Sequence, residues 1–273
     1  MKRATSRVVE TETLSEGWLE TVHMVNASPE QTMFHTMTSI RRPLEEVASI
    51  RKRCDSLLAA LGMAPVETVA NTIFPKRMAD ASADPQALSE RYRAMYPTLR
   101  RWDGNRRGTY FGRIVDYPGT EGSFDQLDRL VAKLRNESAQ RGPMASRYEV
   151  NIAAAADLAT PDGRSDPESG AEAAEAVVVH TERDNSRMGF PCLSLCSFQL
   201  DHGTLHLLAH YRYEFLIKRG YGNYLGLARL QQYVADQCEL DVGELTIVTG
   251  RAQVDTSQKN LNAYVFEGLF DVG

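Results

Sequence analysis

The sequence predicts an α+β fold, in which strands concentrated in the second half of the chain form a sheet and amphipathic helices cover one of its faces. Two apolar runs, 193–200 and 205–213, are separated by the turn-forming residues 201–204, a pattern typical of a β-hairpin. Apolar residues recur at helical spacing over 43–61, 124–136 and 223–238. We find no internal repeat.

The domain organisation follows from changes in composition. Residues 1–20 are mixed and polar, so we expect a flexible N-terminal arm before a single domain over 21–273. Residues 153–176 hold little beyond Ala, Asp, Glu, Gly, Ser and Pro, without a packing pattern. This composition predicts a mobile insertion in the domain.

The first half also gives signals for individual elements. Pro43 suits the first turn of a helix and Gly62 its end. A second apolar stretch, 66–74, is closed by a proline, whereas the aromatic and β-branched residues of 109–115 predict a strand. Ser123 and Gln126 have the spacing of a capping box for the next helix. Further strands are predicted over 148–152, 177–179, 244–254 and 263–270.

Composition and charge exclude several classes of protein. The 273 residues carry a net charge of −5, which argues against a broad nucleic-acid surface but allows a small anion held by local arginines. The chain has no apolar stretch of the ~18 residues that a membrane span needs, and no secretory signal pattern. Its four cysteines are too few and scattered for a disulfide scaffold, so we expect a cytoplasmic protein that binds no metal.

Cys192 is not exceptional by residue type alone. A lone cysteine is more often part of the core than catalytic. The spacing of Cys192 and Cys196 is not that of a zinc site, and on a strand both would lie on the same face. Its interpretation therefore depends on the surrounding residues.

Those residues carry a resemblance. Phe190 to Phe198, with Pro191 directly before Cys192, resembles the proline-cysteine strand of thymidylate synthases. In that family a hairpin, an arginine, a Phe-Asn pair opening a helix and a Gly-Glu strand follow. Here the corresponding residues are the turn 201–204, Arg212, Gly222-Asn223 and Gly243-Glu244, and they match without a gap over about 65 residues. Thr109–Arg113 is similar to the family's Tyr-Gly segment, and Ser146-Arg147 to an arginine strand that reaches across its dimer.

The resemblance implies a thymidylate synthase-like mixed β-sheet, a homodimer, and chemistry on a pyrimidine mononucleotide. The Cys192 thiolate would add to C6, so that C5 can attack a one-carbon unit from 5,10-methylenetetrahydrofolate. Arg212 would bind the phosphate and lower the pKa of the thiol. Asn223 would read the base edge, and Tyr110 would line the substrate site. The alternatives are an ion-pair or surface role for Arg212 and a helix N-cap role for Asn223.

The sequence also departs from the family. The histidine after the cysteine, a phosphate-binding serine, a folate-contacting aspartate and a sugar-binding His-x-Tyr pair are replaced by Leu193, Tyr213, Phe215, Gln253 and Asp255. Asn71 stands nearest to the glutamate of the family's proton network, and equally suits a polar residue at a helix end. Because Gln253 or Asp255 could accept a hydrogen bond from an added hydroxyl, we expect a ribonucleotide or a cytosine form rather than deoxyuridine monophosphate.

Two hypotheses follow. The first is a transferase that moves a methyl or hydroxymethyl group to C5 of a pyrimidine nucleotide. The second is a thymidylate synthase fold whose catalysis has decayed and which now serves as a nucleotide-binding or partner protein. Retention of Cys192, Arg212 and Asn223 favours the enzyme.

Overall fold

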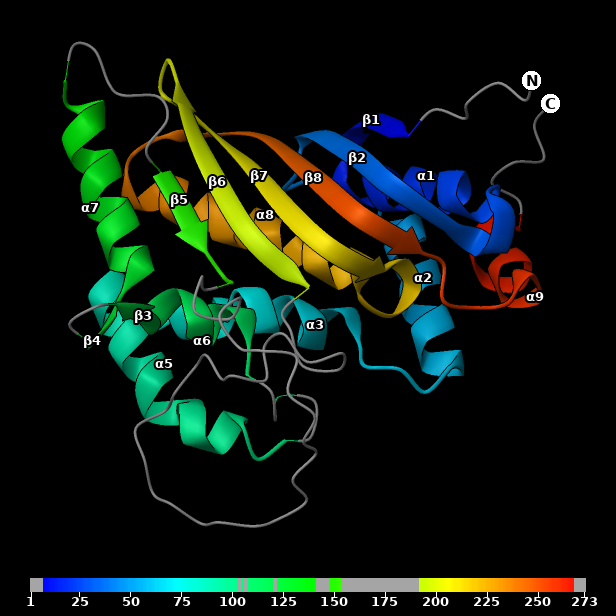
Figure 1. Cartoon of the computed structure of the whole chain (residues 1–273), viewed down its shortest axis with the longest axis horizontal. Coiled ribbons are helices and arrows are strands. Elements are labelled where there is room, and N and C mark those ends of the chain that lie inside the picture. The colour runs from blue at the N-terminus through cyan, green and yellow to red at the C-terminus, as the bar shows by residue number, and fades with distance from the viewer. Residues whose placement is uncertain are drawn as a thin grey trace, which may run out of the picture.

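One mixed β-sheet organises the structure, a computed structural model that describes residues 7–102, 105, 108–119, 122–140, 148–153 and 192–267. Within these residues six strands lie in the order β1-β2-β8-β7-β6-β5 (Figure 1). The strands are β1 (Val8–Thr13), β2 (Thr32–Arg42), β5 (Tyr148–Asn151), β6 (Leu193–Asp201), β7 (Thr204–Phe215) and β8 (Asp241–Gln253). β1 and β2 are parallel, as are β7 and β8, whereas the other neighbours are antiparallel.

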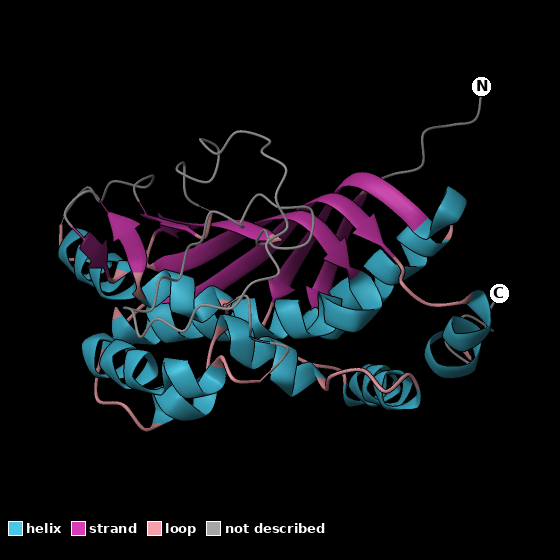
Figure 2. Cartoon of the chain, turned by 60° about the horizontal axis from the view of Figure 1, so that its bottom comes forward, coloured by secondary structure: helices cyan, strands magenta, loops and turns pink. Residues whose placement is uncertain are grey.

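The helices lie on one side of this sheet (Figure 2). They are α1 (Leu14–Asn26), α2 (Ala48–Ala60), α3 (Val66–Ile73), α4 (Lys76–Asp80), α5 (Pro85–Leu99), α6 (Tyr110–Val115), α7 (Gln126–Ser138), α8 (Tyr221–Gln237) and α9 (Gln258–Leu261). Single turns at Pro29–Gln31, Leu216–Gly220 and Asn262–Phe266 and the hairpin of β3 (Tyr117–Gly119) and β4 (Gly122–Phe124) complete the described elements. The prediction of a mixed sheet covered by helices is confirmed.

The second half of the chain follows the sequence prediction closely. β6 and β7 form the expected hairpin, and Asp201 pairs with Thr204 across a turn in which Gly203 has a φ of 87°. Parallel strands need a crossover, and α8 supplies it between β7 and β8. α8 is buried along most of its length against the sheet and α3, so it forms the centre of the hydrophobic core.

The prediction of a flexible N-terminal arm over residues 1–20 is wrong from Val8 onward. Residues 8–13 form the edge strand β1, and the following residues form α1, whose Trp18 is completely buried. Thr13 caps α1 in a reciprocal capping box with Glu16. Polar residues are common in this segment because charged side chains protect an edge strand from pairing with another chain. Composition alone therefore did not distinguish this edge strand from a flexible arm.

The strand predicted over 109–115 is also wrong, because these residues form α6. The Thr109 hydroxyl accepts a hydrogen bond from the Gly112 amide at 3.1 Å and so starts the helix. Phe111 packs edge-on against Tyr92, with ring centroids 4.7 Å apart. A short buried helix and a buried strand have the same apolar composition, so residue type could not separate them.

Other boundaries differ by a few residues. α2 begins at Ala48 rather than at Pro43, which lies in the turn after β2, while Gly62 ends the helix with a φ of 63°. Asp125, not Ser123, caps α7. The strand predicted over 263–270 is helical as far as Phe266. The predicted strand at 177–179 and the insertion at 153–176, from residue 154 onward, lie outside the described residues.

Two glycines allow α8 to approach α3 closely. A Cβ added at Gly222 would lie 2.5 Å from the Cβ of Val69, and one at Gly226 would lie 2.8 Å from the Ala70 carbonyl oxygen. Real Cβ atoms do not approach other atoms this closely, so the helices would have to separate. This contact fixes the position of α8 and of the residues that it carries.

Gly226→Ala should therefore lower the free energy of unfolding by about 1–3 kcal/mol, the usual cost of an overpacked core, although alanine is the better helix former. Urea unfolding would measure the change. Asn136→Ala, at an exposed position of α7, is the control and should change stability by less than about 0.5 kcal/mol. Equal stability of Gly226→Ala and the wild type would contradict the close contact.

Candidate active site

Cys192 lies directly before β6, opposite Arg212 near the end of β7. The Arg212 amide donates a hydrogen bond to the Cys192 carbonyl at 2.7 Å, and Leu193 pairs with Tyr211. The Cys192 side chain is partly buried against the core. The structure therefore brings the two predicted site residues Cys192 and Arg212 together across the β6–β7 pair.

At this point the regular alternation of inward and outward side chains shifts by one residue in both β7 and β8. In β7 the buried positions alternate up to Tyr211 and then resume at Glu214, and in β8 they alternate up to Thr249 and resume at Ala252. Between them Gly250 lies so close to β7 that an added Cβ would be 2.8 Å from the Arg212 carbonyl oxygen. The shift turns Glu214 toward the helices.

Burial and the two nearby arginines shift the pKa of the Cys192 thiol in opposite directions. Partial burial raises the pKa of Cys192 above its usual value, and the negative charge of Glu214 raises it further. Arg219 and Arg212 act in the opposite direction, with Arg219 the stronger of the two. The predicted effect of Arg212 on the thiol pKa thus has the right sign, but in the free protein it does not overcome burial.

Tyr110 reaches the same place from α6. Its hydroxyl is hydrogen-bonded to the backbone of Leu193, and its pKa is raised by burial and by the neighbouring Cys192. α6 is held in position by the hydrogen bond of 2.6 Å between Thr109 and Tyr92. The structure thus brings Tyr110, predicted to line the substrate site, close to Cys192.

Asn223 is bonded to a residue that the sequence analysis missed. Its Nδ2 donates to the Glu214 carboxylate at 2.9 Å, and the Thr249 hydroxyl donates to the other oxygen at 3.2 Å. Asn223 is the third residue of α8 and does not cap it. Glu214 is 2% exposed, and burial raises its pKa to about 7 despite these two hydrogen bonds.

Gln253 and Asp255 are close to the site but already have partners. The Tyr213 hydroxyl donates to Oε1 of Gln253. Asp255 accepts hydrogen bonds from the amides of Ile217 at 2.9 Å and Lys218 at 3.4 Å, and so holds the turn that carries Arg219. The expectation that Asp255 is available for a sugar hydroxyl is weakened, because its carboxylate ties this turn instead.

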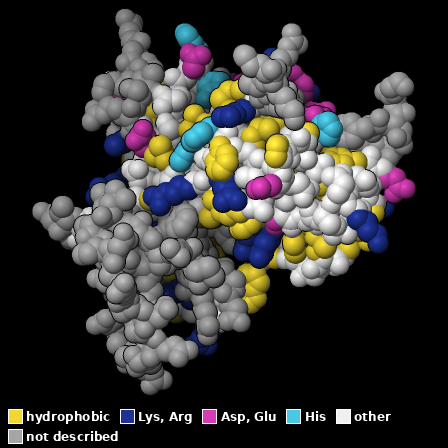
Figure 3. Space-filling model, turned by 45° about the vertical axis from the view of Figure 1, so that its right-hand side comes forward, with side chains coloured by type: hydrophobic (Ala, Val, Ile, Leu, Met, Phe, Trp, Pro, Cys, Tyr) yellow, Lys and Arg dark blue, Asp and Glu magenta, His cyan; other side chains and the backbone are white. Residues whose placement is uncertain are grey.

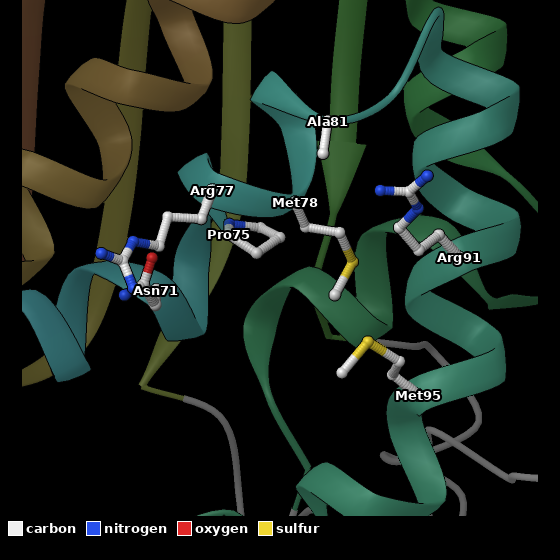
Figure 4. A pocket seen from close by; sticks show the side chains of 7 residues that line it. All are labelled: Asn71, Pro75, Arg77, Met78, Ala81, Arg91 and Met95. Atoms are coloured by element: carbon white, nitrogen blue, oxygen red, sulfur yellow. The ribbon is translucent and has the colours of Figure 1, made fainter.

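Asn71 lies elsewhere. It is exposed on α3 and, with residues of α4 and α5, lines a shallow pocket of about 330 Å³. Figure 4 shows Asn71 and Arg77 at one end of this pocket and Met78, Met95 and Arg91 at the other. None of the six predicted site residues lines it. Its position favours the polar helix-end role for Asn71.

Two functional candidates escaped the sequence analysis. Glu214 was hidden because strict alternation in β7 does not place it inward, and Arg219 because only the turn Leu216–Gly220 brings it back toward Cys192. Phe190, Pro191 and Arg147 lie outside the described residues. In the described part of the chain we find no cluster of three or more metal-ligating side chains. The described helices include none long and apolar enough to cross a membrane.

Comparison with known proteins finds a similarity in the backbone fold. The sequence matches no protein-family model and no curated protein. Among solved structures, thermostable thymidylate synthase A from Bacillus subtilis aligns over 88% of this chain and 79% of its own, with 14% sequence identity and a TM-score of 0.45. At this identity and TM-score the likeness says nothing about activity, which has to come from the residues of the site.

Cys192 should react with iodoacetamide at pH 8.5 faster than the other three cysteines, which are buried. Burial raises the pKa of Cys196 to about 12 and of Cys238 to about 11, and that of Cys54 further. Arg219→Ala should slow labelling of Cys192 by up to about tenfold, the effect of one pKa unit on the thiolate fraction. Peptide mass spectrometry would measure the rates.

Arg251→Ala is the matched control, because Arg251 lies against Tyr213 and Phe34 and does not shift the pKa of Cys192. It should leave labelling unchanged. Equal rates in Arg219→Ala and the wild type would show that Arg219 does not stabilise the thiolate.

Proposed function

We propose that the chain is an enzyme that activates C5 of a pyrimidine mononucleotide by adding Cys192 to C6, the first half of a methyl or hydroxymethyl transfer. The observation that carries this proposal is the group of side chains at the meeting point of β6 and β7. A thiol, two arginines and an amide bonded to a buried carboxylate lie together there. These are the groups needed for a nucleophile, an anionic ligand and a base edge.

Each side chain has a definite task in this reaction. The Cys192 thiol gives up its proton, its sulfur forms a bond to C6, and the electron pair of the C5–C6 double bond moves to C5. Arg212 and Arg219, whose positive charges lower the pKa of Cys192 in the free protein, hold the phosphate. Asn223 contacts the base edge. Gln253, whose Oε1 is taken by Tyr213, retains Nε2 to donate to a sugar hydroxyl.

The residues present do not fit a folate held as the resemblance implies. The position of the folate-contacting carboxylate is occupied by Phe215, whose ring packs against Tyr213 with centroids 4.5 Å apart. A phenyl ring accepts no conventional hydrogen bond from a pterin. We therefore route no step through 5,10-methylenetetrahydrofolate and leave the one-carbon donor unassigned.

The second candidate is a nucleotide-binding protein without catalysis. The raised pKa of Cys192 favours it, because a thiol that stays protonated near neutral pH is a poor nucleophile. A bound phosphate next to Arg219 would raise the thiol pKa further by its negative charge. Activity therefore requires a proton acceptor for the thiol.

A homodimer formed through the open face of the sheet is part of the proposal. Leu195, His210, Val248 and Met37 lie side by side across β6, β7, β8 and β2, and all four are half-buried on the face opposite the helices. On the face that it presents, Figure 3 shows hydrophobic side chains lying among those of Lys, Arg and His. Such a mixed apolar surface suits contact with a second copy.

The reaction can be tested without a one-carbon donor. Thiolate addition makes C5 exchange its hydrogen with solvent, so the protein should release tritium from a nucleotide labelled at C5. Cys192→Ala should abolish the release. Cytidine or uridine monophosphate should react faster than deoxyuridine monophosphate. Binding without any exchange would favour the second candidate, and no binding of any of these nucleotides at millimolar concentration would exclude both.

The dimer can be tested by a charge on the open face. Val248→Arg should convert a dimer into a monomer at micromolar concentration, since an arginine pair would have to be buried at the centre of the interface. Analytical ultracentrifugation would measure the mass, and circular dichroism would verify the fold. Asp236→Arg, on the far side in α8, is the control and should remain dimeric. A monomeric wild type would refute this part of the proposal.

A further inference from the structure

Glu214 holds the side chain of Asn223 by a hydrogen bond in the protein interior. The Nδ2 atom of Asn223 donates to one carboxylate oxygen at 2.9 Å, and the Thr249 hydroxyl donates to the other at 3.2 Å. Glu214 belongs to β7, Thr249 to β8 and Asn223 to the first turn of α8, and all three residues are buried. The sheet is thus bonded to the amide that the sequence analysis assigned to the base edge.

A carboxylate determines which end of the amide faces it. An ionised carboxylate accepts hydrogen bonds and donates none, whereas a carboxamide has a donor end and an acceptor end. Nδ2 of Asn223 must therefore face Glu214, and Oδ1 must point away from it. Among the described residues, none donates a hydrogen bond to this Oδ1 atom. Its acceptor capacity is left for a ligand.

The backbone that carries the amide is also fixed. Gly222, directly before Asn223, lies so close to α3 that an added Cβ would be 2.5 Å from the Cβ of Val69. This contact sets the position of the first turn of α8. The Asn223 side chain is therefore held from the helix side by its backbone and from the sheet side by Glu214.

A purely structural role does not explain a carboxylate at position 214. Its hydrogen bonds from the described residues come from neutral side chains, and a buried charge is costly without a cationic partner. A glutamine would have the same shape and could bond to both Asn223 and Thr249, because a hydroxyl donates and accepts. However, its own amide could turn over and present either oxygen or nitrogen to Asn223. Only the carboxylate gives the Asn223 amide a single orientation.

This orientation matters because the two common pyrimidines have opposite edges. Cytosine presents an amino donor at C4 next to an acceptor at N3, whereas uracil presents an acceptor at C4 next to a donor at N3. With C6 held beside Cys192, the edge of either base lies in the same place. An amide of fixed orientation then matches one base and places like groups opposite each other in the other base.

We propose that Glu214 is a positioning residue that fixes the orientation of the Asn223 amide and thereby makes the site select between cytosine and uracil nucleotides. The inference rests on the proposed function, in which Asn223 contacts the base edge. Glu214 itself does not touch the ligand. The amide cannot turn over to fit the disfavoured base, because Oδ1 would then face the carboxylate oxygen. This unpaired contact is the source of the discrimination.

Glu214→Gln tests the selection directly. In the wild type, the dissociation constants of cytidine and uridine monophosphate should differ by at least about tenfold in isothermal titration calorimetry. Glu214 is ionised at pH 8.5, because burial raises its pKa only to about 7. In Glu214→Gln at this pH the difference should fall to about threefold or less, since Asn223 can turn over. The loss should arise from tighter binding of the disfavoured nucleotide, which structural damage would not produce.

Two variants serve as controls. Thr249→Val removes the other hydrogen bond to Glu214 but leaves the carboxylate to accept from Asn223. It should lower stability and keep the wild-type base preference. Glu244→Gln makes the same chemical change elsewhere in the sheet, where Glu244 accepts hydrogen bonds from Ser39 and Thr246. It should also keep the preference.

Nuclear magnetic resonance tests the bond without a nucleotide. The side-chain amide signal of Asn223, identified by its absence in Asn223→Ala, should move downfield between pH 6 and pH 8.5 in protein with ¹⁵N-labelled asparagine. The reason is that ionisation of Glu214 makes the hydrogen bond charge-assisted. Glu214→Gln should not show this movement. The other titratable groups that the Glu214 charge affects all have a pKa raised by burial and stay neutral in this range: Tyr110, Cys192, Tyr211 and Tyr224.

The outcomes are separable. A wild type without base preference, an unchanged preference in Glu214→Gln, or an equal loss in Thr249→Val would overturn the selection. A wild-type Asn223 signal that does not move would overturn the fixed amide, and this measurement needs no Glu214 variant to fold. If the wild type binds neither nucleotide, the proposed function fails and the selection with it, whereas the signal still decides whether Glu214 fixes the amide.

Discussion

The candidate site depends on one constraint, the shift by one residue in the alternation of inward and outward side chains in β7 and β8. Gly250 leaves no room for a side chain against the Arg212 carbonyl, so the two strands shift together. The shift directs Glu214 to the helix-covered face, whereas simple alternation from Tyr211 would place it on the other face. The Glu214 carboxylate thereby joins Arg219 and Arg212 among the charges that act on the Cys192 thiol at this end of the sheet. With a regular pair of strands, Glu214 would not reach Asn223.

Burial decides the resting state of this site. The arginines favour the thiolate, but removal of water from Cys192 and the charge of Glu214 act more strongly. In the free protein, burial and the Glu214 charge therefore favour the protonated form of the Cys192 thiol, which oxidises more slowly than the thiolate. Reactivity then depends on where the proton goes rather than on the number of positive charges nearby. This differs from the sequence-based view, in which Arg212 alone activated the thiol.

The fold was more predictable than the site. The β6–β7 hairpin followed from two apolar runs around a turn, and α8 from its apolar spacing, because both signals are local. α6 was mistaken for a strand because Phe111 and Ile114 are apolar in either structure. Cys192, Arg212 and Asn223 were proposed as site residues from their fixed separations in the sequence. Glu214 and Arg219 were not, because their positions depend on a strand irregularity and a helical turn that no residue type announces.

Asp255 shows how a position can matter for chemistry without meeting a ligand. Its carboxylate binds the amides of Ile217 and Lys218, and the same turn carries Arg219 toward Cys192. Loss of this carboxylate would free the turn and move the cation, although Asp255 lies more than sixty residues after the thiol in the chain. A mutational survey would rank position 255 among the functional residues for its effect as a tether. Residues of this part of the chain thus serve both as binding site and as the scaffold that holds the binding site in place.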